Sequence, residues 1–317
     1  MDILDNGLYK EDIHIISNLE FIDYNKLKNK SIFISGATGM IGSFLIDVLM
    51  YQNNEQNLNC KIYALGRSKQ NAEKKFKKYK DNPILEFIEA DINKPLEIKE
   101  INNIDYALHL ASNTHPKAYS TDPIGTIMTN IVGTQNMLDF ALEHNCKRFA
   151  FASTCEIYGE NRGDVEKFDE KYCGYIDCNT MRAGYPEGKR CGEALCQAYI
   201  KQKNMDIVIP RLTRTFGPTM FMSDTKAISQ FIKNGIKKEN IILKSEGNQY
   251  YSYTYVADAV SGLLTVLLNG KNGEAYNISD ESCDIRLKDL AKMIADYSKT
   301  KVVFEVPDEI ERAGFSK

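Results

Sequence analysis

The residues with the clearest chemical potential lie in "AGYPEGKR", residues 183–190, where Tyr185 and Lys189 stand four positions apart. Proline is tolerated in the first turn of a helix, so Pro186 predicts a helix that starts here and continues to Tyr199. Residues four apart on a helix share one face. An ammonium group beside a phenol favours the phenolate, which can act as a general base. Alone, such a pair more commonly marks a helix start with a solvated lysine, so other motifs must decide between the two interpretations.

A glycine-rich segment provides the first of these motifs. Gly36, Gly39 and Gly42 in "SGATGMIG" come directly after the apolar strand "SIFIS" and open a helix. Glycine at this spacing permits a tight turn, close approach of the backbone to a pyrophosphate, and close packing of helix on strand. The helix N-terminus adds N–H groups and a favourable dipole for an anion. The segment therefore predicts a dinucleotide site that also includes Thr38, Met40 and Ile41.

The end of the second strand bears on which dinucleotide is bound. An acid there would hydrogen-bond a free ribose 2′-hydroxyl, whereas an arginine suits a 2′-phosphate. The sequence reads "ALGRSK", so Arg67 and Ser68 occupy the place of the acid. Arg67 favours NADP, but it could equally stack on adenine or face solvent, so NAD and NADP both remain open.

The elements that must position these residues alternate between strand and helix. Strand-like runs occur at 31–36, 60–66, 84–92, 105–112, 147–154 and 205–213, and helix-like segments at 40–50, 69–80, 123–144 and 186–203. This alternation predicts βαβ units and an α/β fold, a Rossmann-type doubly wound parallel sheet. We expect a lead-in over 1–30, a dinucleotide-binding domain over 31–212, and a smaller substrate-binding lobe over most of 213–317, with some segments returning to the larger domain.

Composition and charge narrow the possible partners. The chain has 317 residues, 43% of them hydrophobic and 26% charged, with a net charge of −3, which is typical of a globular protein without polybasic character. The lysines between 74 and 80 are expected to form a solvated helix face rather than a nucleic-acid site. The eight cysteines show no metal-ligand spacing and predict reduced thiols. No apolar run reaches membrane length and the start lacks a signal-peptide pattern. We therefore expect a cytoplasmic protein without a metal, a membrane span or a nucleic-acid partner.

Together, the glycine turn, the Ser/Thr segment "FASTCEIYG" (151–159) and Tyr185-x-x-x-Lys189 resemble the short-chain dehydrogenase/reductase superfamily. The chain length, "STCEIYG" and the late "YTYVADA" are similar to its extended branch, the NAD-dependent epimerases and dehydratases that modify nucleotide sugars. Within that branch the pattern is most similar to UDP-glucuronate decarboxylases. The matching segments are "HLASNTHP", "DPIGTIMTNIVGTQNML", "ASTCEIYG", "RAGYPEGKR" and "RTFGPTMFMSD".

The resemblance implies a role for each candidate catalytic residue. Tyr185 would take a proton from the C4 hydroxyl of a sugar, while Lys189 would tune Tyr185 and hold the nicotinamide ribose. Thr154 would hydrogen-bond the reacting oxygen, and Gly188 is expected to leave room for a ligand. Glu156 lies where dehydratases and decarboxylases carry a glutamate, and would move a proton at C5 of a 4-keto sugar. Cys155 replaces the serine or aspartate of those enzymes, and is either a weak acid or a small buried hydrophobe.

The resemblance also implies a tightly bound NAD or NADP and a nucleotide-diphosphate sugar as substrate. The remaining cofactor contacts would come from Asp91, Ile92, Leu110, Ala111 and Ser112, besides Arg67, Tyr185 and Lys189. The substrate contacts would come from Thr114, Glu156, Arg214 and Tyr251. Members of the family pair through the helix that carries Tyr-x-x-x-Lys and the one before it, so we expect a homodimer.

Three positions depart from the decarboxylase pattern. Tyr251 replaces an arginine that meets the diphosphate or acidic end of the substrate, Arg214 replaces an asparagine, and Thr219 replaces another arginine. The substrate could therefore carry a different acidic group or none, and 4-epimerase, 4,6-dehydratase and 4-dehydrogenase activities stay open. A cofactor-sensing regulator on the same fold is the alternative of another class, although such proteins typically lose Tyr185 or Lys189. The chain also stops at "AGFSK", where members of the family usually continue through a further short helical segment.

Overall fold

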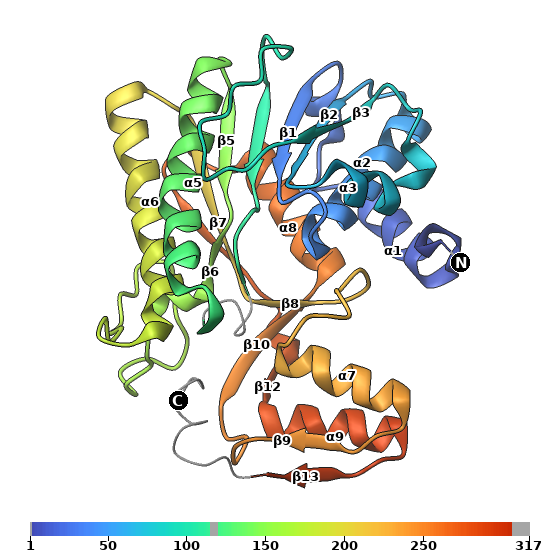
Figure 1. Cartoon of the computed structure of the whole chain (residues 1–317), viewed down its shortest axis with the longest axis vertical. Helices are drawn as coiled ribbons and strands as arrows, with labels where there is room; N and C mark the ends of the chain where they lie inside the picture. The colour runs from blue at the N-terminus through green and yellow to red at the C-terminus, as the bar shows by residue number, and fades with distance from the viewer. Residues whose placement is uncertain (1, 115–119, 306–317) are drawn as a thin grey trace.

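The computed structural model describes residues 2–114 and 120–305, and most of them surround one parallel β-sheet (Figure 1). The strand order is β11-β7-β5-β4-β1-β2-β3, with the short β6 also paired to β7. Every pair within this sheet is parallel. The strands are β1 Ser31–Ser35, β2 Lys61–Gly66, β3 Leu85–Glu89, β4 Tyr106–His109, β5 Arg148–Phe151, β6 Ser153–Thr154, β7 Ile207–Leu212 and β11 Ala275–Ile278. The predicted Rossmann-type fold is confirmed.

The sheet is buried on both faces, which explains the uninterrupted apolar runs of its strands. In β1, Ile32, Phe33 and Ile34 are all fully buried, although consecutive side chains point to opposite faces. Such strands are typical of parallel sheets that carry helices on both sides. Residues 31–66 form the strand–helix–strand unit that the glycine turn requires.

Helices cover the two faces as separate layers (Figure 1). α5 and α6 pack on one face, where Met137, Phe140 and Phe151 belong to one buried cluster. α1, α2 and α8 pack on the other face, where Phe44, Leu45 and Leu263 belong to a second cluster. The helices of these layers are α1 Gly7–Ser17, α2 Met40–Gln56, α5 Pro123–Glu143, α6 Gly184–Lys203 and α8 Val256–Asn269, and the short α3 Lys69–Lys75 lies near β3.

A smaller lobe follows residue 212, below the main sheet in Figure 1. It contains the sheet β12-β10-β8, the pair β13-β9, and a separate buried cluster that includes Phe231, Tyr253 and Leu290. Its elements are β8 Arg214–Phe216, α7 Ala227–Lys237, β9 Ile241–Leu243, β10 Tyr250–Tyr255, β12 Asp284–Arg286, α9 Leu287–Ser298 and β13 Val302–Phe304. α8 and β11 also follow residue 212 but belong to the main sheet layers. The tail "AGFSK" and the end of "HLASNTHP" lie outside the described residues.

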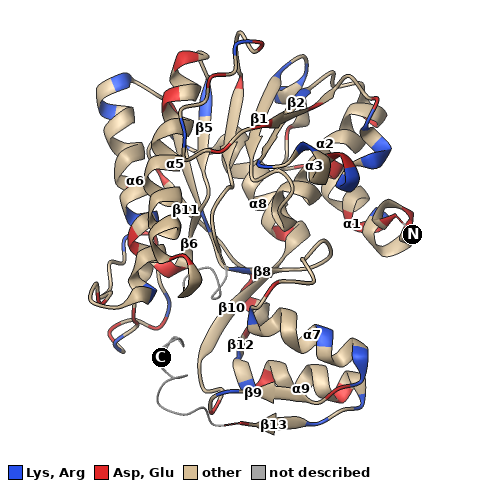
Figure 2. Cartoon of the chain, in the orientation of Figure 1, with Lys and Arg blue, Asp and Glu red and all other residues tan. Residues whose placement is uncertain are grey.

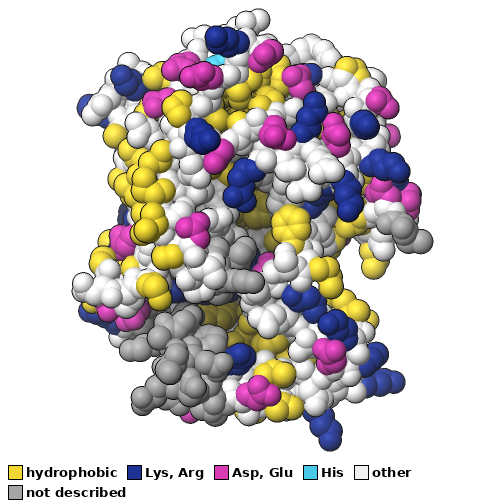
Figure 3. Space-filling view, in the orientation of Figure 1, with side chains coloured by type: hydrophobic (Ala, Val, Ile, Leu, Met, Phe, Trp, Pro, Cys, Tyr) yellow, Lys and Arg dark blue, Asp and Glu magenta, His cyan; other side chains and the backbone are white. Residues whose placement is uncertain are grey.

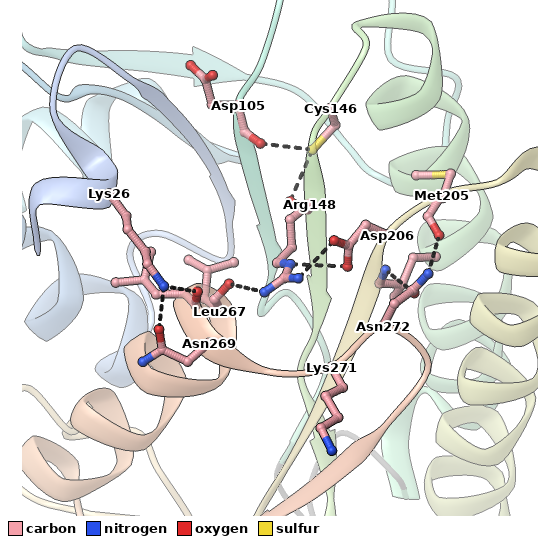
Figure 4. Close-up of polar contacts among 12 residues, drawn as sticks. Lys26, Asp105, Cys146, Arg148, Met205, Asp206, Leu267, Asn269, Lys271 and Asn272 are labelled. Carbon is pink, nitrogen blue, oxygen red and sulfur yellow. Dashed lines mark hydrogen bonds and ion pairs between the residues drawn. The ribbon is translucent and has the colours of Figure 1, made fainter. Parts of the chain in front are cut away.

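Polar contacts join the segments around the amino-terminal ends of the sheet strands (Figure 4). Arg148 on β5 pairs with Asp206 just before β7, with Nη2 2.8 Å from Oδ2, and its Nη1 donates to the carbonyl of Leu267. Lys26 donates to the carbonyl of Leu268 and to Asn269 at the end of α8. These contacts tie the end of α8, in one helical layer, to the amino-terminal end of the sheet.

The surface carries both signs of charge, since Lys and Arg alternate with Asp and Glu over the elements seen in Figure 2. All eight cysteines are free thiols, and Cys60 and Cys196 are fully buried. None of the helices within residues 2–114 and 120–305 combines the length and the apolar character needed to cross a membrane.

Candidate active site

A cavity of about 450 Å³ opens at the carboxyl ends of the parallel strands. The cavity lies at the junction of β1 and β4. The strands that follow β1 along the chain add to one side of the sheet up to β3, and those from β4 onward add to the other side. This reversal of strand order is the usual ligand site of doubly wound sheets. Of the candidate site residues from the sequence, Tyr251 alone is absent from the described lining, and its ring contacts Arg214. The candidates that line the cavity are Gly36, Thr38, Gly39, Met40, Ile41, Gly42, Arg67, Asp91, Ile92, Leu110, Ala111, Ser112, Thr114, Thr154, Cys155, Glu156, Tyr185, Lys189 and Arg214.

The glycine turn has the geometry of a dinucleotide cradle. Gly36 has φ +71°, and a Cβ there would lie 2.8 Å from the backbone nitrogen of Ala111. A Cβ on Gly42 would lie 2.5 Å from the carbonyl oxygen of Gly36. Gly39 is the N-cap of α2 and makes no capping side-chain bond, so the first N–H groups of this 17-residue helix face the turn. Side chains are excluded from the turn on both sides, and these residues fit a pyrophosphate.

The far end of the cavity contains Arg67 and Asp91, at the ends of β2 and β3. Here the carboxylate of Glu89 accepts the N–H of Lys69 at 2.6 Å, and Glu89 is paired in register with Gly66 at the end of β2. An acidic group therefore stands beside the end of β2, although it comes from the neighbouring strand. Sequence reasoning missed Glu89 because only strand pairing brings it there.

Tyr185 and Lys189 lie in the first turns of α6, and Pro186 is within the first turn as predicted. Both side chains are buried, and both line the cavity. The ammonium of Lys189 donates to the carbonyl of Ala152 at 2.8 Å and lies 4.6 Å from the ring centre of Phe151. Lys189 is therefore held against the end of β5 rather than solvated.

Burial controls the protonation of this pair. It raises the pKa of Tyr185 above its ordinary value, and the nearby Glu156 raises it further, while a hydrogen bond from Thr154 lowers it. Burial lowers the pKa of Lys189 to about 8, against the opposing effects of Cys196 and Glu193. In the protein alone, the phenol keeps its proton, so a further positive charge near Tyr185 is needed before it can act as a base.

Thr154, Cys155 and Glu156 form one corner of the cavity after β5. The hydroxyl of Thr154 accepts the N–H of Glu156 at 3.3 Å and caps the short 3-10 turn Cys155–Tyr158. Both carboxylate oxygens of Glu156 accept from Nη2 of Arg182, at 3.2 and 3.0 Å. Burial raises the pKa of the Cys155 thiol, although Arg214 acts in the opposite direction. This leaves a neutral thiol beside a paired carboxylate.

Arg214 and Tyr251 form a single unit. The guanidinium carbon of Arg214 lies 3.7 Å from the ring centre of Tyr251 in a cation–π contact. Within residues 2–114 and 120–305, the guanidinium has no ion pair and no hydrogen-bond acceptor, and Arg214 lines the cavity. The aromatic ring orients the guanidinium and leaves its N–H groups available to an anionic ligand.

Two expectations from the sequence need correction. A Cβ on Gly188 would lie 3.0 Å from Cβ of Asn130 on α5, so this glycine makes room for a neighbouring helix and not for a ligand. Lys75 is not part of a solvated lysine face, since its ammonium donates to the carbonyl of Thr38 at 3.1 Å and lies over the Phe221 ring. Burial lowers the pKa of Lys75 to about 8.

Several lining residues were missed because they come from the smaller lobe. The loop after β8 reaches the start of α2, where the Thr219 hydroxyl donates to the carbonyl of Met40 at 3.0 Å. The cavity residues that this loop contributes are Met220, Phe221, Ser223, Asp224 and Lys226. All of them except Lys226 lie in the matching segment "RTFGPTMFMSD", but only Arg214 and Thr219 of that segment were singled out from the sequence.

Comparison with known sequences matches residues 32–279 to the NAD dependent epimerase/dehydratase family. A UDP-glucuronic acid decarboxylase 1 of Xenopus tropicalis is 35% identical over 251 residues, which cover 79% of this chain and 56% of the relative. UDP-glucuronic acid decarboxylase 3 of Arabidopsis thaliana is 34% identical over 284 residues, covering 89% of this chain and 79% of the relative. The chain thus spans little more than half of the first relative's length.

Solved structures show the same fold. The UDP-glucuronic acid 4-epimerase of Bacillus cereus, in complex with UDP-glucuronic acid and NAD, has a TM-score of 0.73 and 25% identity over 87% of this chain and 86% of that one. The dTDP-glucose 4,6-dehydratase DesIV of Streptomyces venezuelae, with NAD and TYD bound, has a TM-score of 0.75 and 21% identity over 90% and 86%. With the glycine turn and the Tyr-x-x-x-Lys pair in one cavity, the chain belongs to the NAD dependent epimerase/dehydratase family.

Proposed function

We propose that this protein oxidises a nucleotide-diphosphate sugar at C4 with a tightly bound NAD, and that its substrate is UDP-glucuronate or a close analogue. The observation that carries the proposal is that Thr154, Tyr185 and Lys189 share one cavity with the glycine turn. A buried Tyr and Lys on one helix face, next to a dinucleotide cradle, suit proton and hydride removal from one carbon.

The residues would divide the first step among them. When bound, the nicotinamide accepts the hydride that leaves C4 and brings the positive charge that Tyr185 needs. Tyr185 would take the proton of the C4 hydroxyl, and Thr154, which already hydrogen-bonds Tyr185, would hold the same oxygen. Lys189 would add positive charge and bind the nicotinamide ribose. Gly36, Gly39 and Gly42 would hold the pyrophosphate against the start of α2.

The second step would be decarboxylation. A carboxylate at C5 that is β to the new C4 ketone can leave as carbon dioxide, with the electron pair passing to C5 and then to a proton. Glu156 is on the cavity wall close to Tyr185, and would take up a proton from water and deliver it to C5. Hydride would then return to C4. The decarboxylase names of the relatives at 35% and 34% identity support this order.

We propose NAD rather than NADP as the resident cofactor. Arg67 alone would favour a 2′-phosphate, but the carboxylate of Glu89 accepts the Lys69 N–H at the same end of β2. A dianionic phosphate beside this carboxylate would be repelled. The name of the family and the NAD in its solved relatives point the same way.

The reaction that follows C4 oxidation is identified by incubating the protein with UDP-glucuronate and measuring the masses of the nucleotide-sugar products by mass spectrometry. A product lighter by carbon dioxide supports decarboxylation. An unchanged mass with inverted C4, detected by nuclear magnetic resonance, would instead identify a 4-epimerase, the second candidate favoured by the Bacillus cereus relative. If wild-type protein neither reduces bound NAD nor changes any UDP- or dTDP-hexose, the enzymatic proposal is wrong and a cofactor-sensing role is left.

Arg214→Ala should weaken nucleotide-sugar binding by about 1.5–3 kcal/mol, the range for a hydrogen bond to a charged group. Arg214 is the oriented guanidinium of the cavity and lies in β8, away from the glycine turn, so the affinity for NAD should be unchanged. Calorimetric titration with UDP-glucuronate measures the loss. Arg162 is the matched control, because its guanidinium stacks on Tyr175 at 4.4 Å outside the cavity. Equal affinities of wild type, Arg214→Ala and Arg162→Ala would rule out a substrate role for Arg214.

We further propose a cytoplasmic homodimer that pairs through α5 and α6. Ile124, Ile127 and Met128 on α5 are exposed large hydrophobic residues, and Figure 3 shows hydrophobic side chains gathered on the α5–α6 side of the molecule. Such a surface fits an isologous two-fold contact. Eight free thiols are in keeping with a reducing compartment.

Met128→Glu should convert the dimer to a monomer, because a two-fold axis would bury the new charge twice. Sedimentation at micromolar concentration gives the mass. Ile236→Glu on α7 is the control, since Ile236 is an exposed apolar helix residue on the smaller lobe, at 76% exposure against 44% for Met128. A wild-type protein that sediments as a monomer would contradict the proposed assembly.

A further inference from the structure

The catalytic corner Thr154–Glu156 is anchored on both sides by side chains that lie just outside it. Before the corner, the hydroxyl of Ser153 donates to Oε1 of Glu193 at 2.5 Å. After it, the hydroxyl of Tyr158 accepts from Nη1 of Arg211 at 2.9 Å and donates to Asn277 on β11 at 2.6 Å. The corner therefore sits between two fixed points.

Arg211 and Glu193 join these two points to each other. Nη2 and Nε of Arg211 donate to the two carboxylate oxygens of Glu193, at 2.6 and 3.0 Å. Arg211 lies on β7, directly opposite Ser153 in the strand register, and also donates to the carbonyl of Glu170. The side chains of Arg211 and Glu193 are only 10% and 13% exposed. A bidentate pair with this burial holds a defined geometry.

Glu193 also belongs to the helix that carries the proposed base. It lies eight residues after Tyr185 and four after Lys189 on α6, so all three residues share one helix face. Through Glu193, this face is tied to Ser153 and to β7. Movement of Glu193 would change the position of α6 relative to Thr154.

We propose that Glu193 and Arg211 are positioning residues that hold the Thr154–Glu156 corner in register with Tyr185 and Lys189. This inference rests on the proposed function, because the register matters only if Thr154 and Tyr185 act on one oxygen atom. Displacement of reacting groups by about 1 Å can cost about 10²-fold in rate. Ser153 transmits the constraint to Thr154, and Tyr158 transmits it to the turn that holds Glu156.

A second ion pair, Arg148–Asp206, provides a control that distinguishes a positioning role from a general contribution to stability. Arg148 on β5 and Asp206 just before β7 form this pair at the amino-terminal ends of the strands, away from the cavity, with side chains 19% and 35% exposed (Figure 4). Asp206→Asn removes this pair without contact with the cavity. It is the matched control for Glu193→Gln, which keeps the size of Glu193 and an oxygen that can accept from Ser153.

The experiment compares wild type, Glu193→Gln, Ser153→Ala and Asp206→Asn in single-turnover reduction of bound NAD by UDP-glucuronate. We expect Glu193→Gln and Ser153→Ala to lower the rate by up to about 10²-fold at saturating substrate, with little change in substrate affinity. Asp206→Asn should keep the wild-type rate even if its thermal stability falls. Wild-type rates in both Glu193→Gln and Ser153→Ala would overturn the proposal, as would an equal loss in Asp206→Asn.

The pH dependence of the rate is a second test, because a loss of stability alone should not shift it. The groups that face Lys189 are Glu193 and Cys196 on α6, Tyr185 on the same helix, and the buried His109 on β4. Glu193 raises the pKa of Lys189, so replacement of Glu193 by a neutral glutamine should lower the pKa of Lys189 below about 8. The alkaline limb of the rate should shift to lower pH in Glu193→Gln and stay in place in Asp206→Asn. An unshifted limb would contradict the electrostatic effect of Glu193 on Lys189.

Hydrogen–deuterium exchange tests the anchoring of the Thr154–Glu156 corner independently of the proposed function. If wild-type protein fails to turn over any nucleotide sugar, the proposed function fails, yet the exchange of residues 152–158 still reports on the anchoring. Faster exchange there in Glu193→Gln than in Asp206→Asn supports the anchoring. Equal exchange in the two variants overturns it.

Discussion

Tyr185→Phe should lower the rate of hydride transfer by about 10²- to 10⁴-fold, the usual contribution of one positioned general base. The ring would still fill its buried place in the first turn of α6, so the fold and the affinity for NAD should be kept. Only the hydroxyl that hydrogen-bonds Thr154 would be lost. Single-turnover formation of reduced nicotinamide, followed by its near-ultraviolet absorbance, measures the effect.

Tyr199→Phe is the control for this change. Tyr199 lies on the same helix, and its hydroxyl donates to Asp139 on α5 at 2.5 Å, away from the cavity. Removal of that hydroxyl should affect stability without an effect on hydride transfer. A Tyr185→Phe protein that reduces NAD as fast as Tyr199→Phe would show that Tyr185 is only a helix-start residue.

Gly36→Ala should weaken NAD binding by about 10- to 10⁴-fold. The new Cβ would lie 2.8 Å from the backbone nitrogen of Ala111 and 2.9 Å from the carbonyl carbon of Leu110, and the residue would keep φ +71°. Alanine in this conformation costs about 1–2 kcal/mol, so the turn must shift. A shifted turn loses one or two hydrogen bonds to the pyrophosphate, each worth about 1.5–3 kcal/mol. Titration of cofactor-free protein with NAD measures the loss.

Gly262→Ala tests whether such a loss is specific to the turn. A Cβ on Gly262 would lie 2.7 Å from Cγ2 of Ile278, inside the core between α8 and β11. This variant should unfold at a lower denaturant concentration and still bind NAD with wild-type affinity. Equal NAD affinities of Gly36→Ala and wild type would refute the proposed cradle.

The sequence was most informative where one short segment determines its own conformation. A positive φ at Gly36 and the close approach at Gly42 require glycine, and both glycines can be recognised from their place between a strand and a helix. Pro186 likewise marks the start of α6 by its lack of an N–H group. The alternating strands and helices then predict the parallel sheet and the edge at which its ligands bind.

Contacts between distant segments could not be predicted in this way. Gly188 has the same local signature as a glycine that makes room for a ligand, yet its neighbour is Asn130 on another helix. Lys75 resembles its neighbours in sequence, and only the folded chain brings it under Thr38. Glu89 reaches the end of β2 through strand pairing, and Glu193 meets Arg211 through the packing of α6 on β7. In each case the chemical role depends on the partner, which the local sequence does not specify.

Two of the three departures from the decarboxylase pattern, Arg214 and Tyr251, are explained by their contact with each other. Arginine at position 251 would lie against Arg214 with a like charge, whereas the Tyr251 ring accepts the guanidinium at 3.7 Å. Each substitution therefore makes the other favourable. Arg214→Asn combined with Tyr251→Arg should exchange one arrangement for the other, and we expect it to retain activity on UDP-glucuronate better than Tyr251→Arg alone.

The most direct test of the central claim follows the hydrogen atom at C4. UDP-glucuronate carrying deuterium at C4 is mixed with the protein, the reaction is quenched before turnover is complete, and the released cofactor is weighed by mass spectrometry. The proposed chemistry predicts deuterium in the nicotinamide ring with wild-type protein, and a labelling rate about 10²- to 10⁴-fold lower with Tyr185→Phe. A wild-type protein that converts the sugar while its nicotinamide stays unlabelled would contradict oxidation at C4.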